Sequence, residues 1–585
     1  MADPTSPARA SAAAPTGGLH YKWIALTNTT LGVLMATLNG SITLISLPAI
    51  FRGLNLQPLV ASNIGYLLWL LMGYLVVSAV FVVALGRLGD MRGRVRIYNA
   101  GFAVFTIGSI ACALDPLTGA SGAMWLIIWR VVQGFGGAML SANSTAIVTD
   151  AFPVTQRGLA LGVNQVAGLA GSFIGLIAGG LLSVWDWRAV FFLSVPIGIV
   201  GTIWAYRSLR EIGATKRARF DYLGNALWAV GLIAILVAIT YGIQPYGTST
   251  EGWGNPLVLL GLIGGGAALV AFCLVELKVR EPMFNIGLFR IRAFAAGTVS
   301  GLLAAIARGG LQFMLIIWLQ GIWLPLHGYS FDETPLWAGI YLLPLTLGFL
   351  VAGPLAGFLS DRWGARLLAT GGLVVAAISF LLLMVLPVNF AFPAFAGLIF
   401  LNGIGSGLFS APNIASVMNA VPAGQRGAAG GLQSTATFAG MTLSIGIFFS
   451  LMVEGLAGPL KTSLFIGLHA HGVPAQLAGG ISAVPPVGSL FAAFLGYNPL
   501  GTLLSEFGVK ASQLPPGTYH LLTSKEYFPG LISGAFHQGL IVVFAMAAGM
   551  MVLGAVCSIL RGRRVIFVEP APQKPAAPAV SGSSS

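Results

Sequence analysis

The chain has 585 residues, of which 56% are hydrophobic and only 8% are charged. Soluble domains carry about 25% charged residues, so this chain lacks the charge to cover a water-exposed surface of its size. The mean hydropathy of +0.87 agrees with this, and together the values exclude a soluble protein and predict an all-α integral membrane protein. In a soluble protein the net charge of +13 would suggest a nucleic-acid partner. In a membrane protein the positive residues must first be assigned to one side of the bilayer, and we expect no nucleic-acid partner.

Fourteen apolar runs are long enough to cross the roughly 30 Å hydrocarbon core of a bilayer. They begin near Trp23, Ile64, Ile97, Ala123, Gly158, Ala189, Asp221, Pro256, Phe294, Pro335, Leu367, Ala394, Gly427 and Leu531. With the N-terminus in the cytoplasm, most of the 30 Lys and Arg residues fall on the cytoplasmic side. The charges therefore predict a multi-pass protein of the plasma (inner) membrane with both termini cytoplasmic.

The runs divide the chain into two groups of six helices with two helices between them. We predict a disordered cytoplasmic N-terminus (1–22), an N-terminal six-helix bundle (23–210), two additional helices with linkers (211–292), a C-terminal six-helix bundle (293–564) and a disordered tail (565–585). The last bundle includes a long outer loop, 455–529, with an apolar stretch, Pro485–Leu504, that Pro and Gly interrupt. A fifteenth span there would place the C-terminal arginines outside, so we expect a re-entrant or surface-lying element.

Two sequence patterns recur between the halves. The stretch GRLGDMRG at 86–93 returns as GFLSDRWG at 357–364, and PVTQRGLALG at 153–162 returns as PAGQRGAAGG at 422–431. The chain is thus predicted to contain two similar halves in the same orientation. Parallel halves of this kind are a transporter architecture, with the substrate site near the midplane between them.

The loop Gly86–Arg96 (GRLGDMRGRVR) resembles the loop signature of the major facilitator superfamily, G-x-L-a-D-r-x-G-r-r/k. Its glycines allow a tight loop, and its aspartate can cap a helix or pair with arginine. The resemblance implies that both copies form an inner gate. The gating residues would be Gly86, Asp90, Gly93, Arg94, Gly357, Asp361 and Gly364.

Three further stretches resemble motifs of that superfamily. The stretch from Arg130 to Ala138 resembles the family's fourth-span motif, and the glycine-rich Gly171–Gly180 resembles the fifth-span motif of the family's antiporters. Trp187–Gly198 resembles a stretch of the fourteen-span drug:proton antiporter branch. Leu176 stands where the antiporter motif has proline, which weakens that mark. The glycines there are equally explained by close helix packing.

The first span departs from the branch, which carries an acid where this chain has Asn39. None of the 17 acidic residues is predicted at a midplane, whereas Arg130 and Arg308 lie within spans, each followed along its face by Gln133 or Gln312. We expect a substrate cavity of Asn39, Arg130, Gln133, Arg308 and Gln312. Such a cavity would be electropositive and favour neutral or anionic amphipaths, unless helix ends or hydrogen bonds between spans neutralise each arginine.

The proton-coupling site stays open. Asp150 and Glu454 are candidates, as is Asp90, and coupling could be absent. The sequence contains no nucleotide-binding loop, metal-ligand cluster or nucleophile–base pair, so we expect no enzyme, cofactor or metal.

We predict a monomeric secondary active transporter that exports hydrophobic or amphipathic small molecules by alternating access, coupled to protons or another ion. One alternative is a lipid or fatty-acid exporter of the same fold with weak or no proton coupling. The other is a transport-inactive membrane sensor. The two intact gate loops argue against the sensor.

Overall fold

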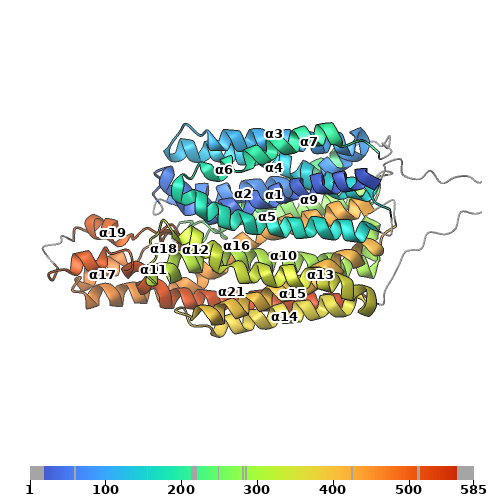
Figure 1. The fold of residues 1–585 in the computed structure, drawn as a ribbon. Helices are drawn as coiled ribbons and strands as arrows, with labels where there is room; N and C mark the ends of the chain where they lie inside the picture. The colour runs from blue at the N-terminus through green and yellow to red at the C-terminus, as the bar shows by residue number, and fades with distance from the viewer. Residues whose placement is uncertain are drawn as a thin grey trace, which may run out of the picture.

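The computed structural model describes residues 19–57, 61–153, 156–212, 221–247, 249–279, 282, 286–422, 426–509 and 514–562, and these are helical apart from connecting turns and one isolated β-bridge. Fourteen of the described helical segments are long and apolar enough to cross a membrane. They run side by side along one axis (Figure 1). The predicted all-α fold with fourteen spans is confirmed.

The first half is a bundle of six spans. Its helices are α1 (Leu19–Gly53), α2 (Ala61–Arg92), α3 (Arg94–Ala113), α4 (Gly119–Ala151), α5 (Arg157–Trp185), and α6 (Ala189–Phe192) with α7 (Ser194–Ser208). Helix α1 packs along α5, α2 and α3 pack along α4, and α3 packs along α7. A Cβ atom at Gly171 or Gly175 of α5 would lie 2.5 or 2.6 Å from the carbonyl oxygens of Leu34 and Leu38 in α1. The fifth-span glycines therefore allow α1 and α5 to approach closely.

The second half repeats this pattern. Its helices are α10 (Arg292–Trp318) with η3 (Leu319–Trp323) and α11 (Leu324–Leu326), α12 (Thr334–Tyr341) with α13 (Leu343–Trp363), α14 (Ala365–Val385), α15 (Phe392–Asn419), α16 (Arg426–Ala470) and α21 (Tyr527–Ile559). Helix α10 packs along α16, α13 and α14 pack along α15, and α14 packs along α21. These are the helix pairs of the first half in the same order, as two copies of one bundle require.

Two seams join the halves. Helix α2 packs on α16 at one seam, and α5 packs on α12 and α13 at the other. The additional helices α8 (Tyr222–Gly242) and α9 (Pro256–Glu276) pack on each other, and α8 contacts both α2 and α16. The indole of Trp228 donates to the carbonyl of Val80 at 3.1 Å. The additional helices therefore lie beside the α2–α16 seam.

The segment 455–529, expected as an outer loop with a re-entrant or surface-lying element, is largely helical. Helix α16 is 45 residues long and continues to Ala470, so it extends well past a bilayer of roughly 30 Å. Four short helices follow: α17 (Ala475–Ile481), α18 (Pro486–Phe494), α19 (Leu500–Glu506) and α20 (Thr518–Leu522). Helices α17 and α18 are bent by 77° relative to each other, and neither is long enough to span alone.

Helix α18 is buried along its whole length and contacts α2, α16 and η3, so it touches both halves. The rings of Phe491 and Phe449 stack with centroids 4.7 Å apart. These short helices lie at the end of the bundle opposite the one where α1 begins and α21 ends (Figure 1). We call the two ends the cap end and the terminal end.

The limits of the predicted disordered segments need one correction. Residues 19–22 were expected in a disordered N-terminus but form the first turn of α1. The remainder of that segment, 1–18, and the predicted tail, 565–585, lie outside the described residues.

Candidate functional site

The first gate loop forms a cluster of charges at the terminal end. Gly93 ends α2 and precedes α3 with a φ of 110°, a backbone conformation that other residues rarely adopt. The guanidinium of Arg94 lies 2.8 Å from Asp90 and 2.6 Å from Asp150 of α4. The structure thus brings together three residues that the sequence singled out, two as gate residues and one as a proton-site candidate.

Glu211, which follows α7, completes this cluster. Its carboxylate accepts hydrogen bonds from the backbone N–H groups of Arg94 at 2.9 Å and Val95 at 3.0 Å. These are among the first N–H groups of α3, which have no partner within the helix. The sequence did not reveal this role, because the contact joins residues more than a hundred positions apart.

The second gate loop has a matching backbone and a different set of side chains. Gly364 lies between α13 and α14 with a φ of 84°, as Gly93 does in the first copy. Gly357 lies in α13, and the side chain of Asp361 is outside what the structure describes. Ala365 stands at the position equivalent to Arg94. The second loop therefore lacks the arginine that links two carboxylates in the first.

Arg130 of α4 lies in the first half and is 1% exposed. Its guanidinium donates to Asn39 Oδ1 at 2.9 Å, to Thr43 Oγ1 at 2.8 Å and to the carbonyl of Leu70 at 2.6 Å. The ring of Tyr74 lies 5.4 Å from the guanidinium carbon. The structure thus places Arg130 and Asn39 together, with α1 and α2 supplying neutral acceptors for the charge.

Gln133 does not join this group. It is fully buried, and its Nε2 donates to Ser109 of α3 at 2.9 Å. A Cβ atom at Gly108 of α3 would lie only 2.7 Å from Cγ of Gln133, so the side chain of Gln133 packs directly on the backbone of α3. The described contacts of Gln133 are thus with α3.

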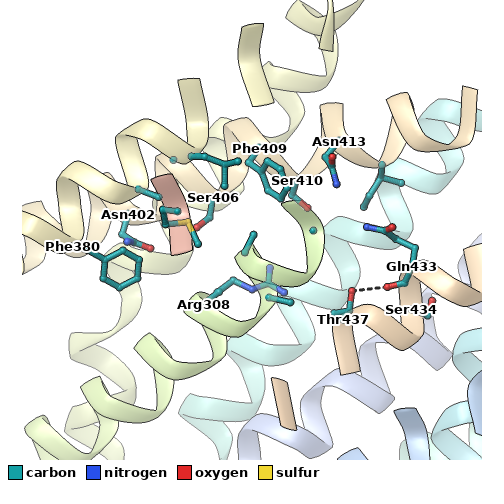
Figure 2. Close-up of a pocket in the computed structure, with 18 residues that line it drawn as sticks. Arg308, Phe380, Asn402, Ser406, Phe409, Ser410, Asn413, Gln433, Ser434 and Thr437 are labelled. Atoms are coloured by element: carbon teal, nitrogen blue, oxygen red, sulfur yellow. Dashed lines mark hydrogen bonds between the residues drawn. The ribbon is translucent and has the colours of Figure 1, made fainter. Parts of the chain in front are cut away.

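Arg308 of α10 lies in the second half and borders a cavity of about 120 Å³. In Figure 2 its side chain points into the space between α15 and α16. Neutral polar side chains line the cavity, namely Asn402, Ser406, Ser410, Asn413, Gln433, Ser434 and Thr437. The apolar side chains of the lining include Leu373, Phe380, Phe409 and Met551. Gln312, one turn further along α10, is half-buried and is absent from the described lining.

Two acidic residues lie near each other at the cap end. Glu454 of α16 is exposed. Glu251, in the loop between α8 and α9, accepts hydrogen bonds from Ser450 Oγ at 2.7 Å and Trp253 Nε1 at 2.8 Å. Burial raises the pKa of Glu251, the two donors lower it, and the charge of Glu454 raises it. Apart from its charge, no sequence pattern marks Glu251 as a functional residue.

Several contacts close the seam between the halves at the cap end. Arg52, at the end of α1, lies 2.9 Å from Asp332, which precedes α12. Gln320 of η3 donates to the carbonyl of Ile45 in α1 at 3.2 Å. A Cβ atom at Gly180 of α5 would lie 2.4 Å from the backbone of Leu336. These contacts, together with α18, connect the first half to the second at this end.

Two repeated six-span bundles that meet along two seams, with a gate loop in each, define a membrane transporter. The chain belongs to the major facilitator superfamily, since residues 29–445 match the family described as Major Facilitator Superfamily. This is a family of transporters and not of enzymes. The fourteen spans and the drug-resistance relatives agree with the fourteen-span drug:proton antiporter branch that the motifs indicated.

Curated relatives have similar length and modest identity. The "Multidrug resistance protein Stp" of Mycobacterium tuberculosis is 30% identical over 447 residues, which are 75% of this chain and 78% of that protein. The "Tetracenomycin C resistance and export protein" of Streptomyces glaucescens is 28% identical, over 81% of this chain and 85% of that protein. The "Riboflavin transporter RibZ" of Clostridioides difficile is 28% identical, over 75% of this chain and 90% of that protein.

A solved structure shares the fold. It is a bacterial homologue of the human lysosomal transporter Spinster, in an inward-facing and occupied conformation. It has a TM-score of 0.52 and 17% identity, and the alignment covers 95% of this chain and all of that one. At this identity the likeness shows the fold alone.

Proposed function

We propose that this chain is a secondary active transporter that exports hydrophobic or amphipathic small molecules across the cell membrane by alternating access. The terminal end is the cytoplasmic end, because most Lys and Arg residues gather there. One chain supplies both bundles, so a monomer suffices.

The observation that carries this proposal is the cavity at Arg308, which lies within a bundle whose seam is closed at the cap end. The Arg52–Asp332 pair, the Gln320 contact and α18 connect the halves on the far side of this cavity from the cytoplasm. A site closed on one side is what alternating access requires in one of its states. The mixed polar and apolar lining suits amphipathic molecules.

The relatives support an export role. Their names describe multidrug resistance, resistance to and export of tetracenomycin C, and riboflavin transport.

The test is transport by the full chain reconstituted into liposomes. We expect ATP-independent flux of an amphipathic dye, and we expect an imposed pH gradient to accelerate it if protons are coupled. Cysteine substitutions of Arg52 and Asp332, cross-linked by a short bifunctional reagent, should hold the cap end closed and stop flux, and cleavage of the linker should restore it. Flux that continues unchanged after cross-linking would contradict alternating access at this seam.

Counterflow that is insensitive to pH would favour the uncoupled lipid or fatty-acid exporter. Absence of flux for every amphipath tested, with folded protein in the membrane, would favour the sensor.

A further inference from the structure

The cavity of the second half carries a positive charge with no opposing charge. Among its lining residues in the described part of the chain, Arg308 is the one charged group, and the others are neutral polar or apolar. The three ion pairs found among the described residues involve Arg52 and Arg94, and Arg308 takes part in none of them. Arg308 is half-buried, and a partly desolvated guanidinium without a protein partner favours an anion from outside the protein.

A second donor in the same cavity also has no protein partner. Asn402 of α15 is 1% exposed, and its Nδ2 has no hydrogen-bond acceptor among the described residues. Figure 2 shows Asn402 and Ser406 on the α15 side of the space into which Arg308 points. Unsatisfied buried donors are rare and call for a ligand or water at the site. Because Nδ2 of Asn402 has almost no accessible surface, its amide would have to turn toward the cavity for one oxyanion at Arg308 to satisfy both donors.

A second arginine lies behind the polar wall. Arg561, just beyond α21, is 3% exposed and donates through Nη2 to Asn413 Oδ1, while Asn413 Nδ2 donates to the carbonyl of Gly297 at 3.1 Å. Nε and Nη1 of Arg561 have no partner in the described part of the chain. Burial lowers the pKa of Arg561 to about 10, which leaves the group charged near neutral pH. This charge adds to the positive potential on the Asn413 side of the cavity.

The other wall and the cavity's size determine what kind of anion fits. Phe380, Phe409 and Met551 give an apolar surface beside the polar groups. The volume of about 120 Å³ is well below the roughly 300–1,000 Å³ of sites that enclose a whole drug-sized ligand. The cavity therefore suits the headgroup and the first carbons of a larger amphipath.

We propose that this cavity is a subsite for the oxyanion headgroup of an amphipathic substrate, in which Arg308 pairs with the anion and Asn402 donates to it. Guanidinium groups bind carboxylate and phosphate oxygens in a fixed, two-pronged geometry, so the pair would also orient the headgroup. The part of this inference that concerns transport rests on the proposed export function, whereas the binding of an anion in the cavity can be tested independently of it.

The binding arm uses the full chain in nanodiscs of phosphatidylcholine and three fluorescent probes with the same tail. These are 11-(dansylamino)undecanoic acid, its methyl ester, and the corresponding alkyltrimethylammonium compound. We expect the acid to bind at least about tenfold more tightly than the ester, and the cation to bind most weakly. Equal affinities for acid and ester would overturn the proposal.

Three variants localise the effect. Arg308→Gln should remove the preference for the acid and spare the ester, and Arg308→Lys should retain part of that preference. Asn402→Asp should also abolish it, because the new carboxylate would neutralise the charge of Arg308. Lys461→Gln removes an exposed cation on α16 and serves as the matched control. Equal loss of acid and ester binding in Arg308→Gln, with Asn402→Asp unchanged in preference, would contradict the assignment.

The source of the anion is tested by adding phosphatidylglycerol to the nanodiscs. Competition with the acid probe at Arg308 would identify a lipid headgroup, and an unchanged affinity would identify a free amphipath. Flux in liposomes then separates the two proposals. Selective binding without flux would refute the exporter and leave the subsite, whereas flux without charge preference would refute the subsite and leave the exporter.

Discussion

The two halves are copies of one bundle, yet the arginine within a span of each half has different surroundings. Arg130 of the first half has three neutral acceptors and an aromatic ring around its guanidinium. Arg308 of the second half has no hydrogen bond or ion pair with the described residues and borders a cavity. The gate loops differ in a similar way. In the first half, Arg94 links Asp90 and Asp150. In the second half, Ala365 stands at the position of Arg94, and Asn419 stands at the position of Asp150.

This difference distinguishes a charge with a structural role, at Arg130, from a charge that is free to bind a ligand, at Arg308. A buried charge that its own protein satisfies contributes to a specific packing arrangement, and its loss leaves the partners unpaired. A half-buried charge without a protein partner, such as that of Arg308, can instead pair with a ligand. The proposed subsite thus lies in the half whose arginine has no partner, and the first half holds its arginine by its own contacts.

The largest expected effect compares Arg130→Leu with Arg308→Leu. Loss of Arg130 leaves Asn39 Oδ1 and Thr43 without their donor, and we expect a destabilisation of about 2–3 kcal/mol, seen as a fall of about 5 °C or more in apparent Tm. Loss of Arg308 removes a half-buried charge that has no protein partner, so the Tm of this variant should be unchanged or higher. Thermal unfolding in detergent, followed by size-exclusion chromatography, measures both. An equal fall in the two variants would break the comparison.

The second effect concerns the gate. Arg94→Ala gives the first loop the residue of the second and leaves Asp90 and Asp150 without their shared cation. If the interaction of Arg94 with the two carboxylates stabilises one conformation by about 1.4 kcal/mol, its loss shifts the population of that conformation about tenfold. We therefore expect flux to fall about tenfold while the affinity for the substrate changes little. Liposome flux and probe binding measure the two quantities. Arg92→Ala removes an exposed cation of the same loop and should retain the flux of the unaltered chain; a similar fall in both variants would indicate a general charge effect.

Sequence reasoning reached the spans, the repeat and the family because hydropathy, charge distribution and loop motifs are local signals. It also singled out Asn39 and Arg130, but their pairing with Thr43 and the Leu70 carbonyl depends on how α1, α2 and α4 pack. The Arg52–Asp332 pair joins distant positions and leaves no local pattern. A re-entrant or surface-lying element was expected at the cap end, but its separate helices were not placed because Pro and Gly residues interrupt the periodicity. Pro is nevertheless well placed at the first turn of α18.

The third effect tests whether the first half can regain a coupling acid. Asn39→Asp places a carboxylate where Oδ1 of Asn39 now lies 2.9 Å from Arg130, and a buried acid that pairs in one state and is protonated in another can couple protons to transport. We expect the stimulation of flux by a pH gradient to rise about threefold over that of the unaltered chain. Asn39→Gln is the neutral control. A pH response identical in the Asp and Gln variants would show that this position alone does not confer coupling.

The smallest effect concerns Glu251, a carboxylate that hydrogen bonds from Ser450 and Trp253 hold at the cap end. Burial raises its pKa above the value in the unfolded chain, so the folded state is favoured below the unfolded pKa, and this advantage is lost as the pH rises through the folded pKa. Glu251→Gln carries no such charge. Its Tm relative to the unaltered chain should therefore increase by about 1–2 °C between pH 4 and pH 8. Glu506→Gln, which changes an exposed carboxylate at the end of α19, is the matched control. A Tm difference for Glu251→Gln that does not change with pH would mean that the two hydrogen bonds outweigh the burial of the carboxylate.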